Sequence, residues 1–147
     1  MNIDIIVKYF HFIGIFGMVS ALFAEQILVK KEVSRAVIKK LARIDLMYGM
    51  SALVALATGL LQWFVVGRAA ELFSRNWIFH TKLTLFVGAL ILSIIPTIYF
   101  IKNRKGGSDD DILKVPAKVK VIIMLEMIAI FIIPLLAILM SRGVGTF

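Results

Sequence analysis

Long runs of apolar residues, separated by short polar segments, dominate the pattern along the chain. Four such runs cover residues 5–29, 45–66, 77–101 and 119–140. Each has roughly 20–25 residues, the length that a helix needs to cross a bilayer. The runs are continuous rather than alternating, which excludes the strands of a membrane barrel. The pattern predicts a single all-α membrane domain, a four-helix bundle with up-down topology.

The polar segments between these runs are expected to be loops, at residues 30–44, 67–76 and 102–118. Apolar residues recur at helical spacing from Val33 to Ile44, so this part extends a neighbouring helix or lies on the membrane surface. Ser108 precedes three aspartates, a pattern typical of the N-cap of a short helix. The residues before position 5 carry an acid and no base, so we expect a retained helix rather than a signal peptide.

Composition agrees with a membrane location. Of the 147 residues 61% are hydrophobic, more than one soluble core of this size can bury. The chain has no cysteine, which excludes a disulfide framework, a thiolate metal site and a redox dithiol. The net charge of +8 is explained by basic loops beside anionic lipids, so no nucleic-acid partner is expected.

The distribution of lysine and arginine predicts the orientation. The middle loop has only Arg68 and Arg75, and the C-terminal tail has only Arg142. We therefore expect loops 30–44 and 102–118 to be cytoplasmic and both termini to face outward. The basic residues of these two loops and their borders are Lys30, Lys31, Arg35, Lys39, Lys40, Arg43, Lys102, Arg104, Lys105, Lys114, Lys118 and Lys120.

Ionisable residues inside the apolar runs are costly and are therefore functional candidates. His11, His80 and Lys82 are expected in the outer half, and Glu25, Asp45 and Glu126 in the cytoplasmic half. Glu25 lies within about 40° of His11 around the first helix, so the two share a face. His80 and Lys82 are about 200° apart, so the third helix can turn only one of them fully inward. Small residues lie on the same side of the third helix as Lys82, which favours Lys82 as the residue that faces inward.

Two further polar residues, Tyr48 and Gln62, lie on a stripe of small residues along the second helix, which is expected to face the bundle interior. Glu126 is too deep to reach water, and Tyr48, Lys120 and Glu25 are its candidate neighbours. Simpler interpretations stay open. Lys82 can extend to the outer surface, and Glu25 and Asp45 can pair with basic residues at positions 30, 31 and 43.

These residues resemble a bacterial four-helix membrane family known as domain of unknown function 2214. The likeness covers the chain up to Arg104 and rests on Tyr9-Phe10-His11, Ala24-Glu25, Asp45 to Gly49 and Phe79 to Leu83, with Gly59 and Ser93 to Thr97. Gln62 departs from the family pattern, which has a basic residue there. The resemblance implies an inner-membrane protein and brings no activity.

A looser similarity is to the membrane protoporphyrinogen oxidase family, four-helix proteins that bind haem. It rests on an early histidine, His11, and on the run Trp77 to Lys82. The resemblance implies a b-type haem between the first and third helices, with His11 and His80 as candidate ligands of the iron. Lys82 would contact a propionate or replace His80.

Three functions follow from these candidates. The first is haem binding for redox or porphyrin-linked work, because histidine is a common axial ligand. The second is small-solute or proton transport, for which four helices would have to form a homo-oligomer. The third is a non-catalytic accessory subunit of a larger membrane complex. Whether the chain is an enzyme stays open.

Overall fold

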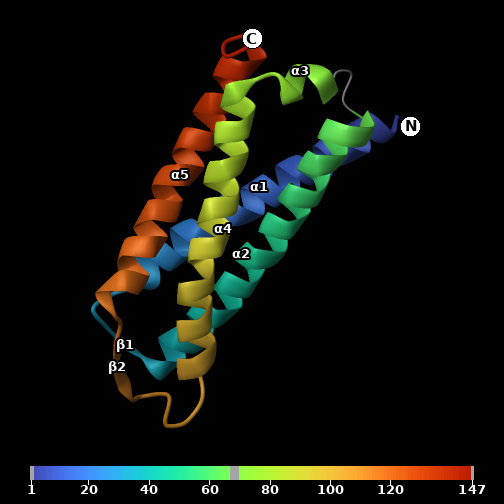
Figure 1. Cartoon of the computed structure of the whole chain (residues 1–147). Helices are drawn as coiled ribbons and strands as arrows, with labels where there is room; N and C mark the ends of the chain where they lie inside the picture. Colours follow the sequence, from blue (N-terminus) through green and yellow to red (C-terminus); the bar gives the residue numbers. More distant parts are fainter. Residues whose placement is uncertain (1, 67–69, 147) are drawn as a thin grey trace.

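Four long helices form the body of the protein in the computed structural model, which describes residues 2–66 and 70–146 (Figure 1). They are α1 (Ile3–Leu28), α2 (Arg35–Leu61), α4 (Trp77–Asn103) and α5 (Ala117–Ser141). All four are long and apolar enough to cross a membrane, with α2 continuing through the π-helical turn η1 (Gln62–Val66). The all-α four-helix bundle is thus confirmed.

The helices pack in the cyclic order α1, α2, α4, α5, which leaves α1 and α4 diagonal to one another. The pair α1–α2 and the pair α4–α5 meet at one end and separate toward the end that carries both termini (Figure 1). Most of the buried apolar cluster belongs to the closed end, where Leu22, Ile38, Phe100 and Ile123 are fully buried. The half of the bundle at this closed end is therefore more tightly packed than the half near the termini. We call the first the closed half and the second the open half.

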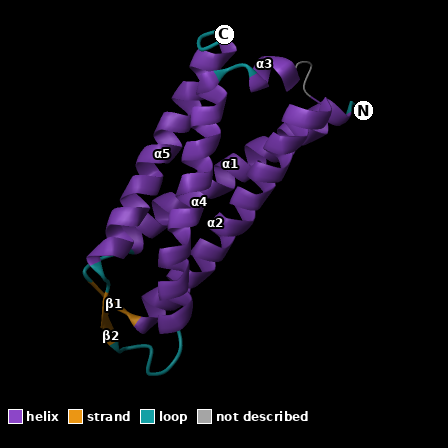
Figure 2. Ribbon diagram, in the orientation of Figure 1, coloured by secondary structure: helices purple, strands orange, loops and turns teal. Residues whose placement is uncertain are grey.

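A small two-stranded sheet closes the tightly packed end (Figure 2). Strand β1 (Glu32–Ser34) pairs antiparallel with β2 (Ile112–Lys114), with Val33 opposite Leu113. The segment from Ser108 therefore forms a turn and a strand, and the expectation of a short helix there is wrong. Asp109 and Asp111 instead use their carbonyls to accept from the first amides of α2, at 3.1 and 2.9 Å.

Side chains set the starts of two helices. The Ser34 hydroxyl accepts from the amide of Val37, so α2 begins at Arg35, well before the apolar run that starts at residue 45. Asn76 caps α4 by accepting from the amides of Ile78 and Phe79 at 2.9 and 3.3 Å. The short helix α3 (Ala70–Ser74) lies before this cap, in the segment expected to be a loop.

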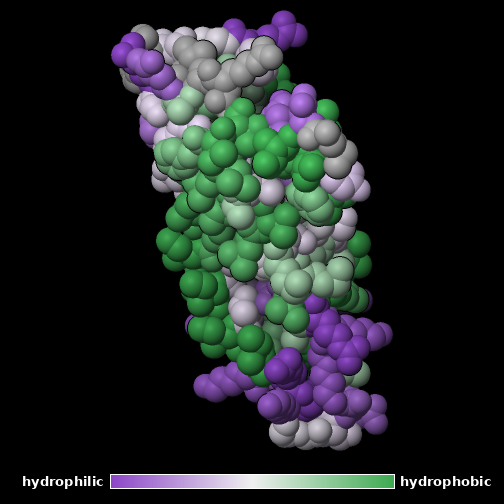
Figure 3. Space-filling model, turned by 90° about the vertical axis from the view of Figure 1, so that its right-hand side faces the viewer, coloured by the Kyte–Doolittle hydropathy of each residue, from purple (hydrophilic) through white to green (hydrophobic). Residues whose placement is uncertain are grey.

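Hydropathy divides the surface into an apolar middle and polar ends (Figure 3). Hydrophilic residues gather most strongly at the end that holds the sheet, where the basic loops lie. Large apolar side chains such as Phe16, Leu53, Ile91 and Phe131 are exposed around the middle of the bundle. Such a band is the surface that a bilayer covers.

Candidate functional site

Three acidic side chains are buried inside the closed half of the bundle. Glu25 of α1, Asp45 of α2 and Glu126 of α5 are exposed by 1%, 5% and 3% of their surface. Each comes from a different helix, and they are close enough to interact electrostatically. We call these three residues with Tyr48 the carboxyl cluster. Its burial follows from the helical faces, because each acid lies on the same face as the apolar core of its helix.

Two hydroxyl groups lie beside the three acids of this cluster. Tyr48, itself 3% exposed, donates from its hydroxyl to Oε1 of Glu126 at 3.2 Å. The Thr97 hydroxyl of α4 donates to the Ser93 carbonyl at 2.9 Å and lies near the Asp45 carboxyl, so all four long helices contribute to the region. Glu25 differs from the other acids, because its Oε1 atom is buried and has no hydrogen-bond partner among the described residues. This atom is therefore free to bind a proton or a donor group.

Among the described residues, no basic side chain neutralises the cluster. Within residues 2–66 and 70–146, none of the three acids takes part in an ion pair. The alternative that Glu25 and Asp45 pair with the bases at positions 30, 31 and 43 is therefore wrong. The buried Arg35 is occupied elsewhere, since its guanidinium donates to the carbonyls of Asn103 and Lys105, both at 2.7 Å, and pairs with Asp111.

His11 forms the centre of a second polar region, in the open half of the bundle. Its Nδ1 atom lies 2.9 Å from the Ala55 carbonyl and 3.0 Å from the Thr58 hydroxyl, both on α2. Gly59 leaves room for the ring, because a Cβ at that position would lie 3.3 Å from Cε1 of His11. His11 is therefore anchored to α2.

The two candidates on α4 point in different directions. Lys82 is half-buried, its Nζ atom lies 5.5 Å from the centre of the Phe79 ring, and it interacts electrostatically with His11. His80 is exposed, and its Nε2 atom lies 2.8 Å from the Ser74 carbonyl at the end of α3. The structure thus turns Lys82, and not His80, toward the interior.

Gln62 occupies the start of the π-helical turn η1. Its side chain is half-buried, and its Nε2 atom is buried without a hydrogen-bond partner among the described residues. Arg68, the nearest basic residue expected in the middle loop, lies outside the described residues.

A family model described as a predicted membrane protein, domain of unknown function 2214, matches residues 3–145. The chain belongs to this family. No curated protein and no solved structure matches the chain significantly. The stated resemblance to family 2214 is thereby confirmed across nearly the whole chain, and the protein is a membrane protein of a family without a known activity. The resemblance to protoporphyrinogen oxidases finds no support in these comparisons.

The side chains of this family 2214 member fit a haem only in part. His11 fits, because an Nδ1–H group donated to the Ala55 carbonyl leaves a lone pair on Nε2, the arrangement common for metal-bound histidine. His80 does not fit as its partner across the bundle, because it is exposed and held by Ser74. Lys82 lies on the inner side of α4, where contact with an anionic group is open to it.

Sequence reasoning missed the two threonines that contact the candidate residues. Thr58 follows Tyr48 and Ala55 at spacings that continue the small-residue stripe of α2, so helical phase could have found it. Thr97 immediately follows Pro96, on the side of α4 that faces α2. Its contact with Asp45 depends on how two helices pack and has no local signal.

Proposed function

We propose that this protein takes up and releases protons at the carboxyl cluster, as the central step of a proton-linked function in the membrane. One observation carries the proposal: Oε1 of Glu25 is buried among other carboxyl groups and has no partner in the described residues. A carboxylate in such surroundings is strongly disfavoured unless it binds a proton or another cation. The cluster thus holds a site that a proton fills.

The surroundings of the cluster favour a proton over a metal ion. Among the described residues, no three His, Cys, Asp or Glu side chains converge as a metal ion requires. Tyr48 supplies a hydroxyl that can pass a proton as well as donate one, and it already contacts Glu126. A proton needs one oxygen atom, and the free Glu25 oxygen provides it.

The open half of the bundle, on the far side of the carboxyl cluster, offers a proton fewer polar groups. Between the carboxyl cluster and His11, the inner face of α2 carries Ala52 and Ala55, which are 1% and 3% exposed. These alanines offer no side-chain group to relay a proton. We therefore propose that the cluster exchanges protons with the end of the bundle that holds the sheet, and that transport across the whole membrane uses a homo-oligomer.

The test is to replace Glu25 with glutamine, which keeps the shape and removes the titratable group. Infrared difference spectra of the purified protein, recorded as the pH is stepped, report the carbonyl stretch of protonated carboxyl groups. We expect Glu25→Gln to remove one such band. The control Glu71→Gln, which changes a glutamate with a 77% exposed side chain, should keep it. An unchanged set of bands in Glu25→Gln would overturn the proposal.

A flux measurement separates proton transport from proton binding alone. The protein is reconstituted into vesicles that contain a pH-sensitive dye, and a potassium diffusion potential drives protons inward. We expect uptake above that of empty vesicles, and uptake at the empty-vesicle level for Glu25→Gln and Glu126→Gln. A cluster that binds protons but gives no proton flux would point to the accessory-subunit function instead. In such a subunit the buried polar groups fix how the helices pack.

Haem binding at His11 is the second candidate function, favoured by the Nδ1 contact with Ala55 that leaves Nε2 available. When bound, a b-type haem would supply one-electron chemistry. The test compares oxidised and dithionite-reduced absorption spectra of the purified protein after haem addition. We expect a Soret band that is lost in His11→Ala and kept in His80→Ala. A colourless wild-type protein would refute this candidate.

A further inference from the structure

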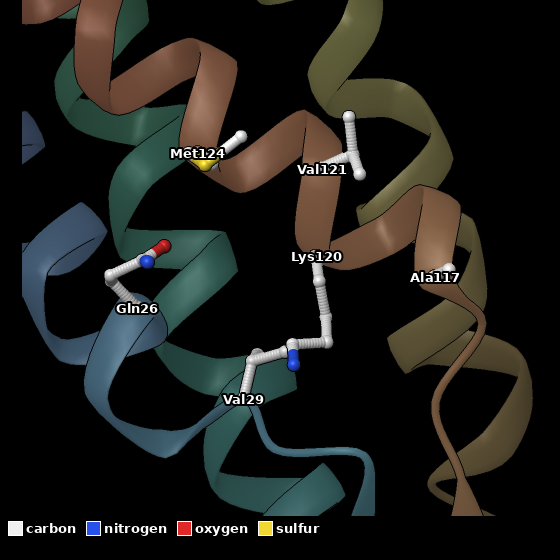
Figure 4. A pocket seen from close by; sticks show the side chains of 6 residues that line it. All are labelled: Gln26, Val29, Ala117, Lys120, Val121 and Met124. Atoms are coloured by element: carbon white, nitrogen blue, oxygen red, sulfur yellow. The ribbon is translucent and has the colours of Figure 1, made fainter.

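Two adjoining pockets lie at the sheet end of the bundle, between the end of α1 and the start of α5. The first has a volume of about 380 Å³ and is lined by Gln26, Val29, Ala117, Lys120, Val121 and Met124 (Figure 4). The second has a volume of about 420 Å³ and is lined by Lys31, Glu32, Lys114, Val115, Ala117 and Lys120. Ala117 and Lys120 line both pockets, and we call the two pockets together the depression.

The depression has a positive charge. Lys31, Lys114 and Lys120 line it together with a single acid, Glu32. In the part of the chain that the structure describes, none of these three lysines forms an ion pair. Three ammonium groups around one depression attract a phosphate group.

The first pocket adds an apolar wall to this charged rim. Val29 directly follows α1 as its C-cap. Val121 and Met124 belong to the first turns of α5, on the side nearer to the apolar middle of the bundle. The Lys120 side chain extends from α5 toward Val29, and the Gln26 side chain points into the space below Met124 (Figure 4). Charged and apolar walls therefore meet in this depression, a combination that suits a lipid headgroup and the start of its chains.

We propose that this depression binds one anionic phospholipid. Its phosphate lies among Lys31, Lys114 and Lys120, and the beginning of an acyl chain packs against Val121 and Met124. The apolar wall favours a lipid over a soluble phosphate compound, since Val121 and Met124, which are 47% and 46% exposed, belong to the apolar surface on which acyl chains pack. This site is independent of the carboxyl cluster and of its proposed function.

The experiment titrates the detergent-purified protein with phosphatidylglycerol or phosphatidylcholine of the same chains and counts bound lipids by native mass spectrometry. We expect tighter binding of phosphatidylglycerol, and a loss of about fivefold in its affinity for Lys120→Ala. Lys118→Ala is the matched control, because Lys118 is exposed on the same helix and lines neither pocket. Lys120→Arg keeps the charge and should retain binding.

Three results would overturn the proposal. Equal binding of the two lipids would show that the phosphate-binding lysines do not select charge. An equal loss in Lys118→Ala would indicate diffuse attraction to the basic surface rather than a site. Displacement of phosphatidylglycerol by inorganic phosphate at low millimolar concentration would assign the depression to a soluble phosphate compound. Circular dichroism of each variant shows that its helices are intact before binding is measured.

Discussion

The hydroxyl of Tyr48 is the one hydrogen-bond donor from a side chain that reaches Glu126 within the described residues. Tyr48→Phe removes this donor and keeps the ring, so Glu126 remains buried with one partner fewer. We expect a loss of about 1 kcal/mol in the free energy of unfolding, since a buried acceptor without its donor carries a desolvation cost. Unfolding in mixed micelles of increasing dodecyl sulfate content, followed by circular dichroism, measures it.

Tyr9→Phe is the control for this change, because Tyr9 is 58% exposed on the surface of α1. Its loss of a hydroxyl should leave stability unchanged within the error of the method. Equal stability of Tyr48→Phe and the wild type would contradict the expected stabilisation by the hydrogen bond between Tyr48 and Glu126.

At the scale of the helix pair, α1 and α2 approach closely where glycines replace larger side chains. A Cβ at Gly14 would lie 2.8 Å from the backbone nitrogen of Ala55 and 2.9 Å from the carbonyl oxygen of Ser51. These are backbone atoms, so the helices must move apart to admit it. We expect Gly14→Ala to lower the free energy of unfolding by about 1–3 kcal/mol, measured in the same micelles.

Gly49→Ala gives the opposite expectation on the same helix pair. Apart from the adjoining backbone of α2, no heavy atom of the described residues lies within 4 Å of a Cβ at this position. Alanine there reduces the freedom of the unfolded chain, so stability should rise by up to about 1 kcal/mol. Destabilisation of both variants to the same extent would contradict this explanation, because the loss could then not come from the close approach at Gly14.

The elements show how far the sequence could predict this fold. The four helices follow from apolar runs, because lipid leaves no other way to satisfy so many backbone groups. The strands β1 and β2 have three residues each and pair with a partner far away in the sequence, so no local periodicity marks them. The helical spacing from Val33 to Ile44 left open whether this part extends a helix or lies on the membrane surface. The structure shows that it extends α2, whose start at Arg35 depends on the Ser34 cap.

The candidate site could be predicted to a similar extent. Burial of Glu126 beside Tyr48 follows from depth and helical phase, which are properties of single helices. The phase difference on α4 likewise separates Lys82 from His80. The convergence of Glu25, Asp45 and Glu126 depends on how α1, α2 and α5 pack together. That arrangement is a property of the tertiary structure.

Orientation belongs to the whole molecule. The sheet end holds the two strongly basic loops, whereas both termini lie at the opposite end (Figure 1). Because basic loops stay cytoplasmic, we expect both termini outside the cytoplasm. The chain has no cysteine, so single cysteines can report each end. In intact cells, a membrane-impermeant maleimide should label Asn2→Cys but not Ser108→Cys, both of which are at exposed positions.

Opening the membranes should make Ser108→Cys reactive. This result would show that the absence of labelling in intact cells reflects the location of the residue and not its burial. The cysteine-free parent should stay unlabelled throughout. Labelling of Ser108→Cys in intact cells would reverse the orientation and would place the lysine-lined depression outside. Labelling of both variants would indicate two orientations in one membrane. Labelling of Asn2→Cys alone would set the carboxyl cluster nearer to the cytoplasm, because Glu25 and Asp45 lie in the half of the bundle that the sheet closes.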